Sequence, residues 1–572
     1  MGPTVAVPYS TPPALPGPDA RALPRWSPPP RRVYSYGVAH VTDRPPPSSP
    51  PSPGAAGLNA GGSRGPNPGV RSVWLRRLSP RWAFFTFAVL ALLAFTLWLR
   101  YTIPTPAPVA VAPEPRPSSV AILPFVNASP DSAGEYFSDG VTEELTAALG
   151  RVPGLRVAGP ASAFALQRSG GDPRDAGRRL GVSTVLEGSV RQVNDRLRLS
   201  VHLVSVSEGF DLWSETYERP PDEIFAVQDE IVRSVVATLR IRGAERWADS
   251  VRPAASLEAY LTYLWARHAL SGWPGADASR AATLYQEAIG LDSSFAPAWA
   301  GLAEADVQRA LTQGARPSEA MPAARAAAIR ALALDSSLAV AHSALAEVHF
   351  FYDRDWSAAD TAFQRAIAIN PNRPDAHRAY ARLLLATGRP DEALRHARRG
   401  LELDPLDPET IAQLGWHDFY VRNYAEVRES FDRALAADTS RVETRRSLGL
   451  LAEVMGDYEL AESQYRAALD RAPDDPEALA ALGRVHALDG RPEEARAVLA
   501  RLDSLTAGRY VSPYLLASIA EALGDRRRAF AWLEEAVEDR AGDVVYLDLD
   551  PRLDRLRDDR RFARIRQSLK LP

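Results

Sequence analysis

A residue pattern that recurs every 34 positions constrains this chain more than any other feature of its sequence. A small residue marks the pattern at Ala366, Gly400, Ala434 and Ala468. Seven residues before each of these lies another small aliphatic residue, and the position between them holds Phe363, Ala397, Phe431 and Tyr465. A fixed period of this length predicts an array of similar units, each burying its apolar face against the next.

The turns inside and between the units support two helices per unit. Glycines start the predicted inner turns at Gly388, Gly456 and Gly490, and prolines close units at Pro371, Pro405 and Pro473. Glycine provides a left-handed helix end and proline suits a helix start. The pattern resembles the tetratricopeptide repeat (TPR). We expect about eight repeats over residues 256–540, an all-α superhelical solenoid, and a polar-faced capping helix over residues 541–572.

A TPR superhelix has a concave groove lined by the first helix of each repeat. Usual TPR geometry would place six side chains there: Arg378, Arg382, Trp416, Phe419, Arg446 and Arg484. Arginine forks beside aromatic faces suit an extended protein or peptide segment with acidic groups or a free carboxylate. The alternative interpretation is that these arginines only solvate a helix face.

Residues 82–99 form an 18-residue run without charge, WAFFTFAVLALLAFTLWL. As a helix this run covers roughly 27 Å, close to the hydrocarbon thickness of a bilayer. Aromatic residues lie at both ends, as interfacial residues do. The sequence therefore predicts a single transmembrane helix over residues 81–101. A cleaved signal peptide, with translation starting near residue 73, is the competing interpretation.

The flanking sequences predict an orientation for this helix. Arginines are concentrated before it, which favours a cytoplasmic N-terminus and extracytoplasmic C-terminal domains at a bacterial inner membrane. Residues 1–80 are rich in proline, glycine and serine and are expected to form a disordered tail. The proline-rich residues 102–117 would then act as a stiff spacer.

A small α/β domain is predicted over residues 118–243. Ser119 to Val126 forms a short buried strand, and helical spacing follows from Phe137. Thr184 to Val193 leads into the turn Asn194-Asp195 and then into a strand with strict apolar/polar alternation. That alternation indicates a hairpin with one buried face. A further strand with Trp213 and a helix from Ile224 complete the prediction.

Several phrases of this domain resemble the TolB-like N-terminal-type domain. They include SVAILPFVN, EYFSDGVTEEL, RRLGVSTVLEGSVRQVNDRLRLSVHLV and LWSETYERPPDEIFAVQDEI. The resemblance covers residues 118–241. In that family the domain usually joins an output module, such as a kinase, a nucleotide cyclase or a winged-helix DNA binder, to a TPR array. The resemblance implies a signalling or assembly context and supplies no catalytic residues.

Composition excludes several kinds of chemistry. The chain has no cysteine, and Lys570 is the only lysine. Thiol nucleophiles, cysteine-ligated metals, P-loop lysines and Schiff-base lysines are therefore excluded. With 67 basic and 71 acidic residues, the net charge of −4 does not favour nucleic acid binding. We expect no cofactor and no metal, and the sequence does not indicate an oligomeric state.

Three apparent sites are better interpreted as structural. The carboxylates Asp139, Glu143, Glu144 and Glu187 could be taken for a metal or acid–base set, but acidic residues in the first turns of a helix, such as Asp139 and Glu143, are favoured by the helix dipole and solvent alone. The repeat positions of His342, His349, His377 and His486 normally hold packing residues. A G-x-S-x-G match at residues 61–65 lies in the proline-rich tail, where the strand and helix that a nucleophile elbow requires are not predicted.

The sequence thus predicts a membrane-anchored, non-enzymatic scaffold that gathers protein partners in a TPR groove. The alternative function is signal transduction, in which partner or ligand binding outside the cytoplasm is relayed to a separate cytoplasmic effector.

Overall fold

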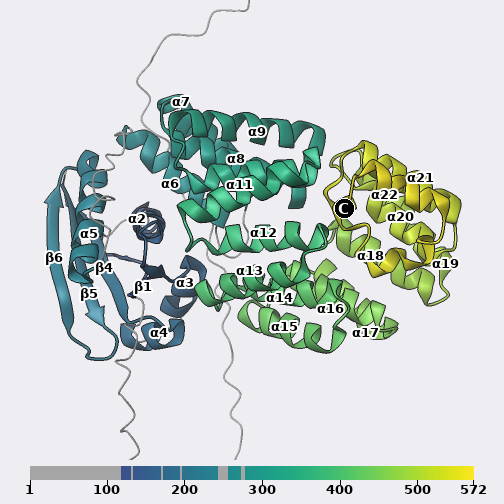
Figure 1. Cartoon of the computed structure of the whole chain (residues 1–572), viewed down its shortest axis with the longest axis horizontal. Coiled ribbons are helices and arrows are strands. Elements are labelled where there is room, and N and C mark those ends of the chain that lie inside the picture. The colour runs from purple at the N-terminus through teal and green to yellow at the C-terminus, as the bar shows by residue number, and fades with distance from the viewer. Residues whose placement is uncertain are drawn as a thin grey trace, which may run out of the picture. The chain divides into compact units, whose positions relative to one another are not determined.

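The computed structural model describes residues 118–129, 133–168, 172–193, 196–241, 256–271, 277–312 and 314–571. A small α/β domain comes first and an array of helix pairs follows (Figure 1). The predicted tail, transmembrane helix and spacer lie outside the described residues, as does the turn at residues 194–195. Within the described ranges, no helix combines the length and the apolar character needed to cross a bilayer.

The α/β domain is built on one mixed sheet with the strand order β3-β1-β4-β5-β6. Strands β1 and β3 run parallel, as do β1 and β4, whereas β4, β5 and β6 form an antiparallel meander. The strands are β1 (Ser119–Ile122), β2 (Val126–Asn127), β3 (Arg156–Val157), β4 (Thr184–Val193), β5 (Arg196–Ser205) and β6 (Asp211–Arg219).

The strand expected over residues 119–126 is two short strands. Pro124 follows β1, and a proline has no N–H with which to continue a ladder. The next N–H, that of Phe125, donates to the Thr142 hydroxyl at 2.9 Å. The chain then pairs again with β4 through β2. The predicted hairpin between β4 and β5 is confirmed, with Thr184 opposite Ser205.

Helices cover both faces of the parallel part of the sheet. Side chains alternate along β1, so Val120 and Ile122 face one side while Ala121 faces the other. The first two belong to a core with helices α2 (Ala133–Gly150) and α5 (Ile224–Thr238), which the short turn η1 (Pro221–Glu223) precedes. Ala121 packs in a separate core with helices α3 (Pro160–Arg168) and α4 (Pro173–Leu180).

Eight successive helix pairs follow in the described residues. They are α6 (Leu257–Ser271) with α7 (Ala278–Leu291), α8 (Ala296–Thr312) with α9 (Pro317–Leu334), α10 (Ala339–Glu347) and its π-turn η3 (Val348–Asp353) with α11 (Trp356–Ile369), α12 (Pro374–Ala386) with α13 (Pro390–Leu403), α14 (Pro408–Tyr420) with α15 (Tyr424–Ala437), α16 (Val442–Val454) with α17 (Tyr458–Leu469), α18 (Pro476–Leu488) with α19 (Pro492–Leu505), and α20 (Pro513–Ala522) with α21 (Arg526–Glu538).

Close helix crossings explain the small residues of the repeat. A Cβ added at Gly415 would lie 2.5 Å from the ring of Phe431, and one at Gly449 would lie 2.4 Å from the ring of Tyr465. The small residue of the first helix therefore makes room for the large residue of the second. This arrangement is the structural basis of the 34-residue pattern.

The turn between the two helices of a repeat uses a left-handed residue at the same repeat position. From the third repeat to the eighth, this residue is Arg354, Gly388, Arg422, Gly456, Gly490 and Gly524, each with positive φ. Left-handed backbone costs a side chain about 1–2 kcal/mol, which is why glycine predominates. The two arginines therefore require a separate explanation.

The C-terminal segment differs from the expected capping helix. Residues 541–571 form two 3₁₀ turns, η4 (Gly542–Tyr546) and η5 (Pro551–Leu556), and one short helix, α22 (Arg560–Ser568). Apolar side chains from all three pack on α20 and α21, including Leu547, Leu553 and Phe562. Pro551 follows η4 closely, so one continuous helix cannot form across the segment.

Candidate functional site: the inner surface of the repeat array

Arginines predicted to line the groove form ion pairs between repeats. Arg378 of α12 pairs with Glu409, at 2.5 Å, in the first turn of α14. Arg446, at the same repeat position two repeats later, pairs with Glu477 at 2.8 Å in the first turn of α18. Arg382 pairs with Glu347 at 2.5 Å. These arginines thus connect successive first helices as well as contributing charge.

The ion-paired arginines are still accessible to a ligand. The side chains of Arg378, Arg382 and Arg446 remain 24%, 28% and 20% exposed. The guanidinium of Arg378 lowers the pKa of Glu409 to about 2. Burial raises the pKa of Glu477 to about 7, although Arg446 opposes the shift. Arg446 also pairs with Asp475 at 2.8 Å, so Glu477 is one of two acidic partners.

Two predicted groove residues lie in the interior instead. The Phe419 side chain is buried in a core of the fifth and sixth repeats, with 1% exposed. Arg484 lies between Glu453, at 2.5 Å, and Glu521, at 2.6 Å, and its side chain is 7% exposed. Sequence position alone suggested a groove for Arg484, but two acidic neighbours permit its burial. Trp416 is half-buried and packs on the rings of Tyr420 and Phe431.

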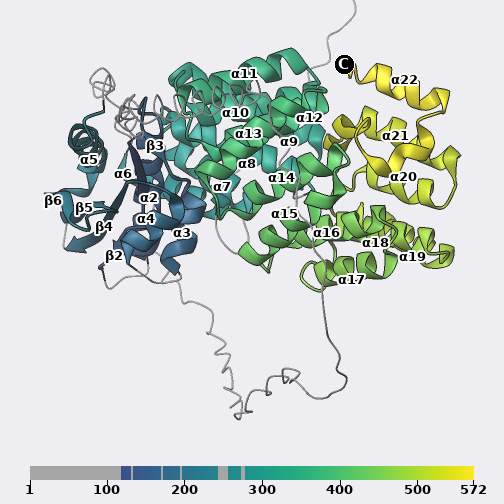
Figure 2. The same cartoon turned by 60° about the horizontal axis from the view of Figure 1, so that its bottom comes forward.

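The C-terminal segment returns to the middle of the array (Figure 2). The ring of Tyr546 stacks on Tyr420 at the end of α14, with 5.2 Å between centroids, and meets Phe350 of η3 edge-on. The N–H of Tyr510 donates to the Gly314 carbonyl at 2.9 Å. The superhelix is therefore closed by contacts of its C-terminal segment with the third and fifth repeats and by a contact of the turn before the eighth repeat with the second repeat.

The left-handed arginines take part in this closure. Arg422 forms two hydrogen bonds with Asp554, at 2.7 and 2.8 Å. Arg354 donates to the Val537 carbonyl at 3.0 Å. Each arginine replaces the usual glycine at its turn, and its side chain contacts α21 or the C-terminal segment, so the backbone cost is accompanied by a contact that glycine cannot make.

The carboxylates of the α/β domain do not form a common site. Glu143 and Glu144 of α2 pair with Arg267 of α6 at 2.7 and 2.9 Å, and Glu144 also accepts from the Tyr263 hydroxyl. These contacts attach the first repeat to the α/β domain. Glu187 lies on β4 instead. Among the described residues no group of three potential ligands could hold a metal ion.

A second contact joins the α/β domain to the turns after α11 and α13. The Asn372 amide donates to the Gly150 and Leu155 carbonyls at 2.9 and 2.8 Å. Asp404 is buried and accepts hydrogen bonds from both the N–H, at 2.7 Å, and the hydroxyl of Ser162. Burial raises the pKa of Asp404 to about 8.

Four histidines of the array contact side chains or carbonyls of their own or a neighbouring helix or turn. Nδ1 of His349 lies 2.9 Å from the Asp353 carboxylate, and Nδ1 of His377 lies 2.9 Å from Nδ1 of His396. His342 contacts the Ser336 carbonyl, and His486 is buried near Glu494. Each histidine contacts its own or an adjacent helix rather than a shared ligand position.

Comparisons with known proteins identify the repeat class. Residues 350–414 and 446–509 match models described as tetratricopeptide repeat. Together with the helix pairs, these matches establish that the chain carries TPR repeats, a module of protein–protein interaction.

Two curated bacterial proteins are similar to parts of the chain. "Putative adenylate cyclase 3" of Rhizobium meliloti (strain 1021) is 36% identical over 203 residues, which cover 34% of this chain and 34% of that protein. "Cellulose synthase operon protein C" of Pseudomonas fluorescens (strain SBW25) is 28% identical over 149 residues, 26% of this chain and 10% of that protein. The chain thus spans about a third or less of the length of these relatives.

Solved structures match only loosely. The structure of Pseudomonas aeruginosa pilF is 21% identical, with a TM-score of 0.30, and the match covers 38% of this chain and 95% of that one.

Proposed function

We propose that this chain is a non-enzymatic scaffold that gathers protein partners through its TPR array and is anchored in a bilayer by residues 81–101. The observation that supports partner binding is the row of partly exposed inter-repeat arginines on the first helices, of which Arg378 and Arg446 occupy one repeat position.

The partner class follows from the chemistry of these arginines. A guanidinium binds carboxylates through paired N–H groups, so an acidic peptide segment can replace Glu409 beside Arg378 or Glu477 beside Arg446. A partner carboxylate must compete with those intramolecular acids. Arg446 also pairs with Asp475 at 2.8 Å, so a partner carboxylate there must compete with two acids of the chain.

Affinity capture with the full chain tests the scaffold. We expect proteins recovered with the wild type to be lost with the double variant Arg378→Ala, Arg446→Ala. Arg428→Ala is the matched control, because Arg428 lies on a second helix and its exposed ion pair with Asp432 stays within that helix. Equal recovery with the double variant and the wild type contradicts groove binding.

The anchor has its own test. The full chain should stay in the membrane fraction after a high-salt wash and dissolve in detergent, since a transmembrane helix is held by hydrophobic burial rather than by charge. A C-terminal reporter active only outside the cytoplasm is expected from the predicted orientation. Release by salt alone is inconsistent with the anchor.

A relay to a cytoplasmic effector is the second candidate function. The similarity to a protein named as an adenylate cyclase favours it, because that name describes a signalling output. Cross-linking from residues 1–80 followed by mass spectrometry separates the two functions. A stable cytoplasmic partner supports relay, and its absence supports scaffolding alone.

A further inference from the structure

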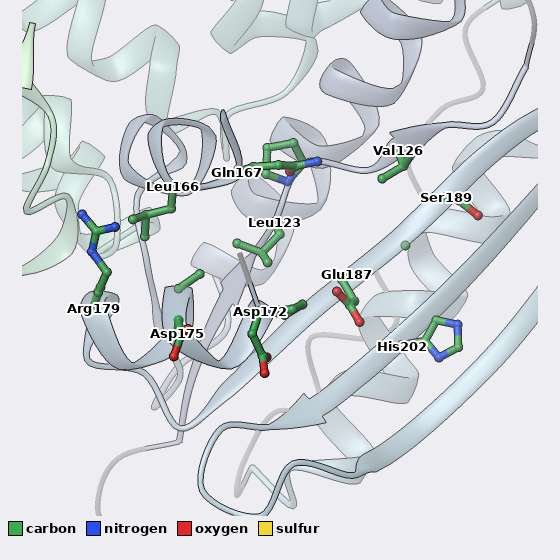
Figure 3. Close-up of a pocket in the computed structure, with 14 residues that line it drawn as sticks. Leu123, Val126, Leu166, Gln167, Asp172, Asp175, Arg179, Glu187, Ser189 and His202 are labelled. Atoms are coloured by element: carbon green, nitrogen blue, oxygen red, sulfur yellow. The ribbon is translucent and has the colours of Figure 1, made fainter. Parts of the chain in front are cut away.

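A cavity of about 420 Å³ lies in the α/β domain at the carboxyl end of β1 (Figure 3). The chain leaves β1 for α2 on one face of the sheet, whereas α3 and α4, which follow the neighbouring strand β3, cover the other face. Ligands of open α/β sheets bind outside the carboxyl ends of strands where the connections diverge in this way. The cavity is thus in a position suited to a ligand.

The walls of the cavity are partly apolar. Leu123 and Pro124 follow β1, Leu166 comes from α3 and Ala176 from α4. Val126 lies at the rim, and 54% of its surface is exposed. Small-molecule sites combine such a wall with a few polar groups, and this volume lies within their usual range of roughly 300–1,000 Å³.

Most of the charges around the cavity are already neutralised by a neighbour. The guanidinium of Arg179 also lines the cavity, at the end opposite to His202 (Figure 3). The paired groups are Asp172 with Arg174, Asp175 with Arg178, and His202 with Asp211.

Glu187 is different, because none of the described residues gives its carboxylate a hydrogen bond or an ion pair. It projects from β4 beside Asp172 (Figure 3) and is half-buried. Burial raises the pKa of Glu187, and Asp211 and Asp172 add to the shift while His202 opposes it. A shielded carboxylate without a donor is a group that a ligand can satisfy.

We propose that this cavity binds a small organic cation with an apolar body, whose ammonium or amidinium N–H groups donate to the Glu187 carboxylate. The hydrocarbon part of the ligand lies against Leu123 and Leu166. Charge-assisted hydrogen bonds supply the orientation and apolar contact supplies area. The proposal is independent of the TPR groove, since every wall residue belongs to the α/β domain.

Calorimetric titration of the full chain with benzylamine tests the site. Benzylamine carries a primary ammonium on one aromatic ring, and benzyl alcohol and benzoate have the same ring with a neutral and an anionic group. We expect saturable binding of benzylamine in the millimolar range and neither of the others at the same concentration. Glu187→Gln should weaken benzylamine binding about tenfold or more, because a charge-assisted hydrogen bond is lost.

Two further variants make the result interpretable. Glu208→Gln changes an exposed carboxylate outside the cavity and should leave benzylamine binding unchanged. Ala176→Leu narrows the cavity while Glu187 itself is unchanged, and it should also weaken benzylamine binding. Circular dichroism checks that each variant is folded. No saturable binding, equal binding of benzyl alcohol, or full binding by Glu187→Gln overturns the proposal.

Discussion

Ser162 donates both its N–H and its hydroxyl to Oδ1 of Asp404. In other repeats, the aspartate that ends the second helix accepts the same two hydrogen bonds from the serine two positions later in the sequence. In those turns, Oδ1 of the aspartate accepts from the serine N–H and hydroxyl; the pairs are Asp292 with Ser294, Asp335 with Ser337, and Asp438 with Ser440. After Asp404 the corresponding position is Leu406, and Ser162 of the α/β domain takes the place of the missing serine. The contact between domains thus reproduces a turn of the repeat.

Loss of the Ser162 hydroxyl should weaken the whole structure. Ser162→Ala leaves a buried carboxylate with one donor fewer, so we expect the free energy of unfolding to fall by about 1–3 kcal/mol. Ser294→Ala removes the same hydrogen bond at an exposed turn and should cost under about 1 kcal/mol. Urea denaturation of both variants measures the difference, and equal losses would contradict a special role for Ser162.

Asp404 should make stability depend on pH. Its pKa is raised by burial from 3.8 to about 8 in the folded state, so the folded state retains a proton that the unfolded state loses above about pH 4. The stabilising contribution of this proton is full below pH 4 and is lost as the pH rises through 8. Asp404→Asn mimics the protonated form and should therefore gain stability relative to the wild type as the pH increases. Denaturation midpoints across this range test the prediction, and Asp438→Asn is the control.

Arg484 and Arg446 should respond differently to the same change. Arg484→Gln leaves Glu453 and Glu521 buried without their cation, which typically costs about 3–5 kcal/mol of stability. Arg446→Gln changes a more exposed site and should cost about 1 kcal/mol or less. Thermal denaturation compares the two. A mild effect at Arg484 would mean that its two carboxylates are protonated or solvated.

The closure of the superhelix can be measured with a double-mutant cycle on Arg422 and Asp554. Arg422→Gly relieves the left-handed backbone but removes a bidentate ion pair, so its net effect should be near zero. Asp554→Ala should cost up to about 1 kcal/mol in the wild type and less beside Arg422→Gly, where only the pair of Asp554 with Arg557 is left to lose. Additive effects would show that the two side chains are not coupled.

Two helical glycines, Gly415 and Gly290, should differ in how well they tolerate replacement by alanine. Gly415→Ala forces a Cβ to within 2.5 Å of the Phe431 ring and is expected to cost about 1–3 kcal/mol. Gly290, in α7, has no neighbouring atom within 4 Å of such a Cβ, so Gly290→Ala should stabilise the protein by up to about 1 kcal/mol. Chemical denaturation measures the free energy of unfolding of both variants. Similar changes in the two variants would contradict a steric conflict at Gly415.

The sequence predicted the features that depend on local periodicity. The small residues at Ala434 and Ala468, the left-handed turn at Gly388 and the alternating strand after residue 195 each follow from spacing along the chain. Features that depend on distant partners could not be read in this way. The burial of Arg484 requires Glu453 and Glu521 on other repeats, and the breaking of the segment after residue 541 reflects its packing on α20 and α21.

The candidate sites also combine features that follow from local spacing with features that depend on distant residues. Spacing placed Arg378 and Arg446 at one repeat position, but it did not reveal that each pairs with an acid of the next repeat. The cavity beside Glu187 combines five separate segments of the α/β domain, and only the carboxylate itself was singled out from the sequence. Its missing donor is a property of the folded arrangement rather than of any motif.

Closure through Tyr546 and Arg422 has a consequence for how the repeats lose structure. In an open solenoid the terminal repeat has one neighbour and frays first. Here the C-terminal segment packs on the eighth repeat and also contacts the third and fifth repeats. The amides of the eighth repeat should therefore exchange with deuterium almost as slowly as those at the centre of the array. A superhelix closed in this way is expected to unfold in a single cooperative transition, without populated intermediates in which terminal repeats are unfolded.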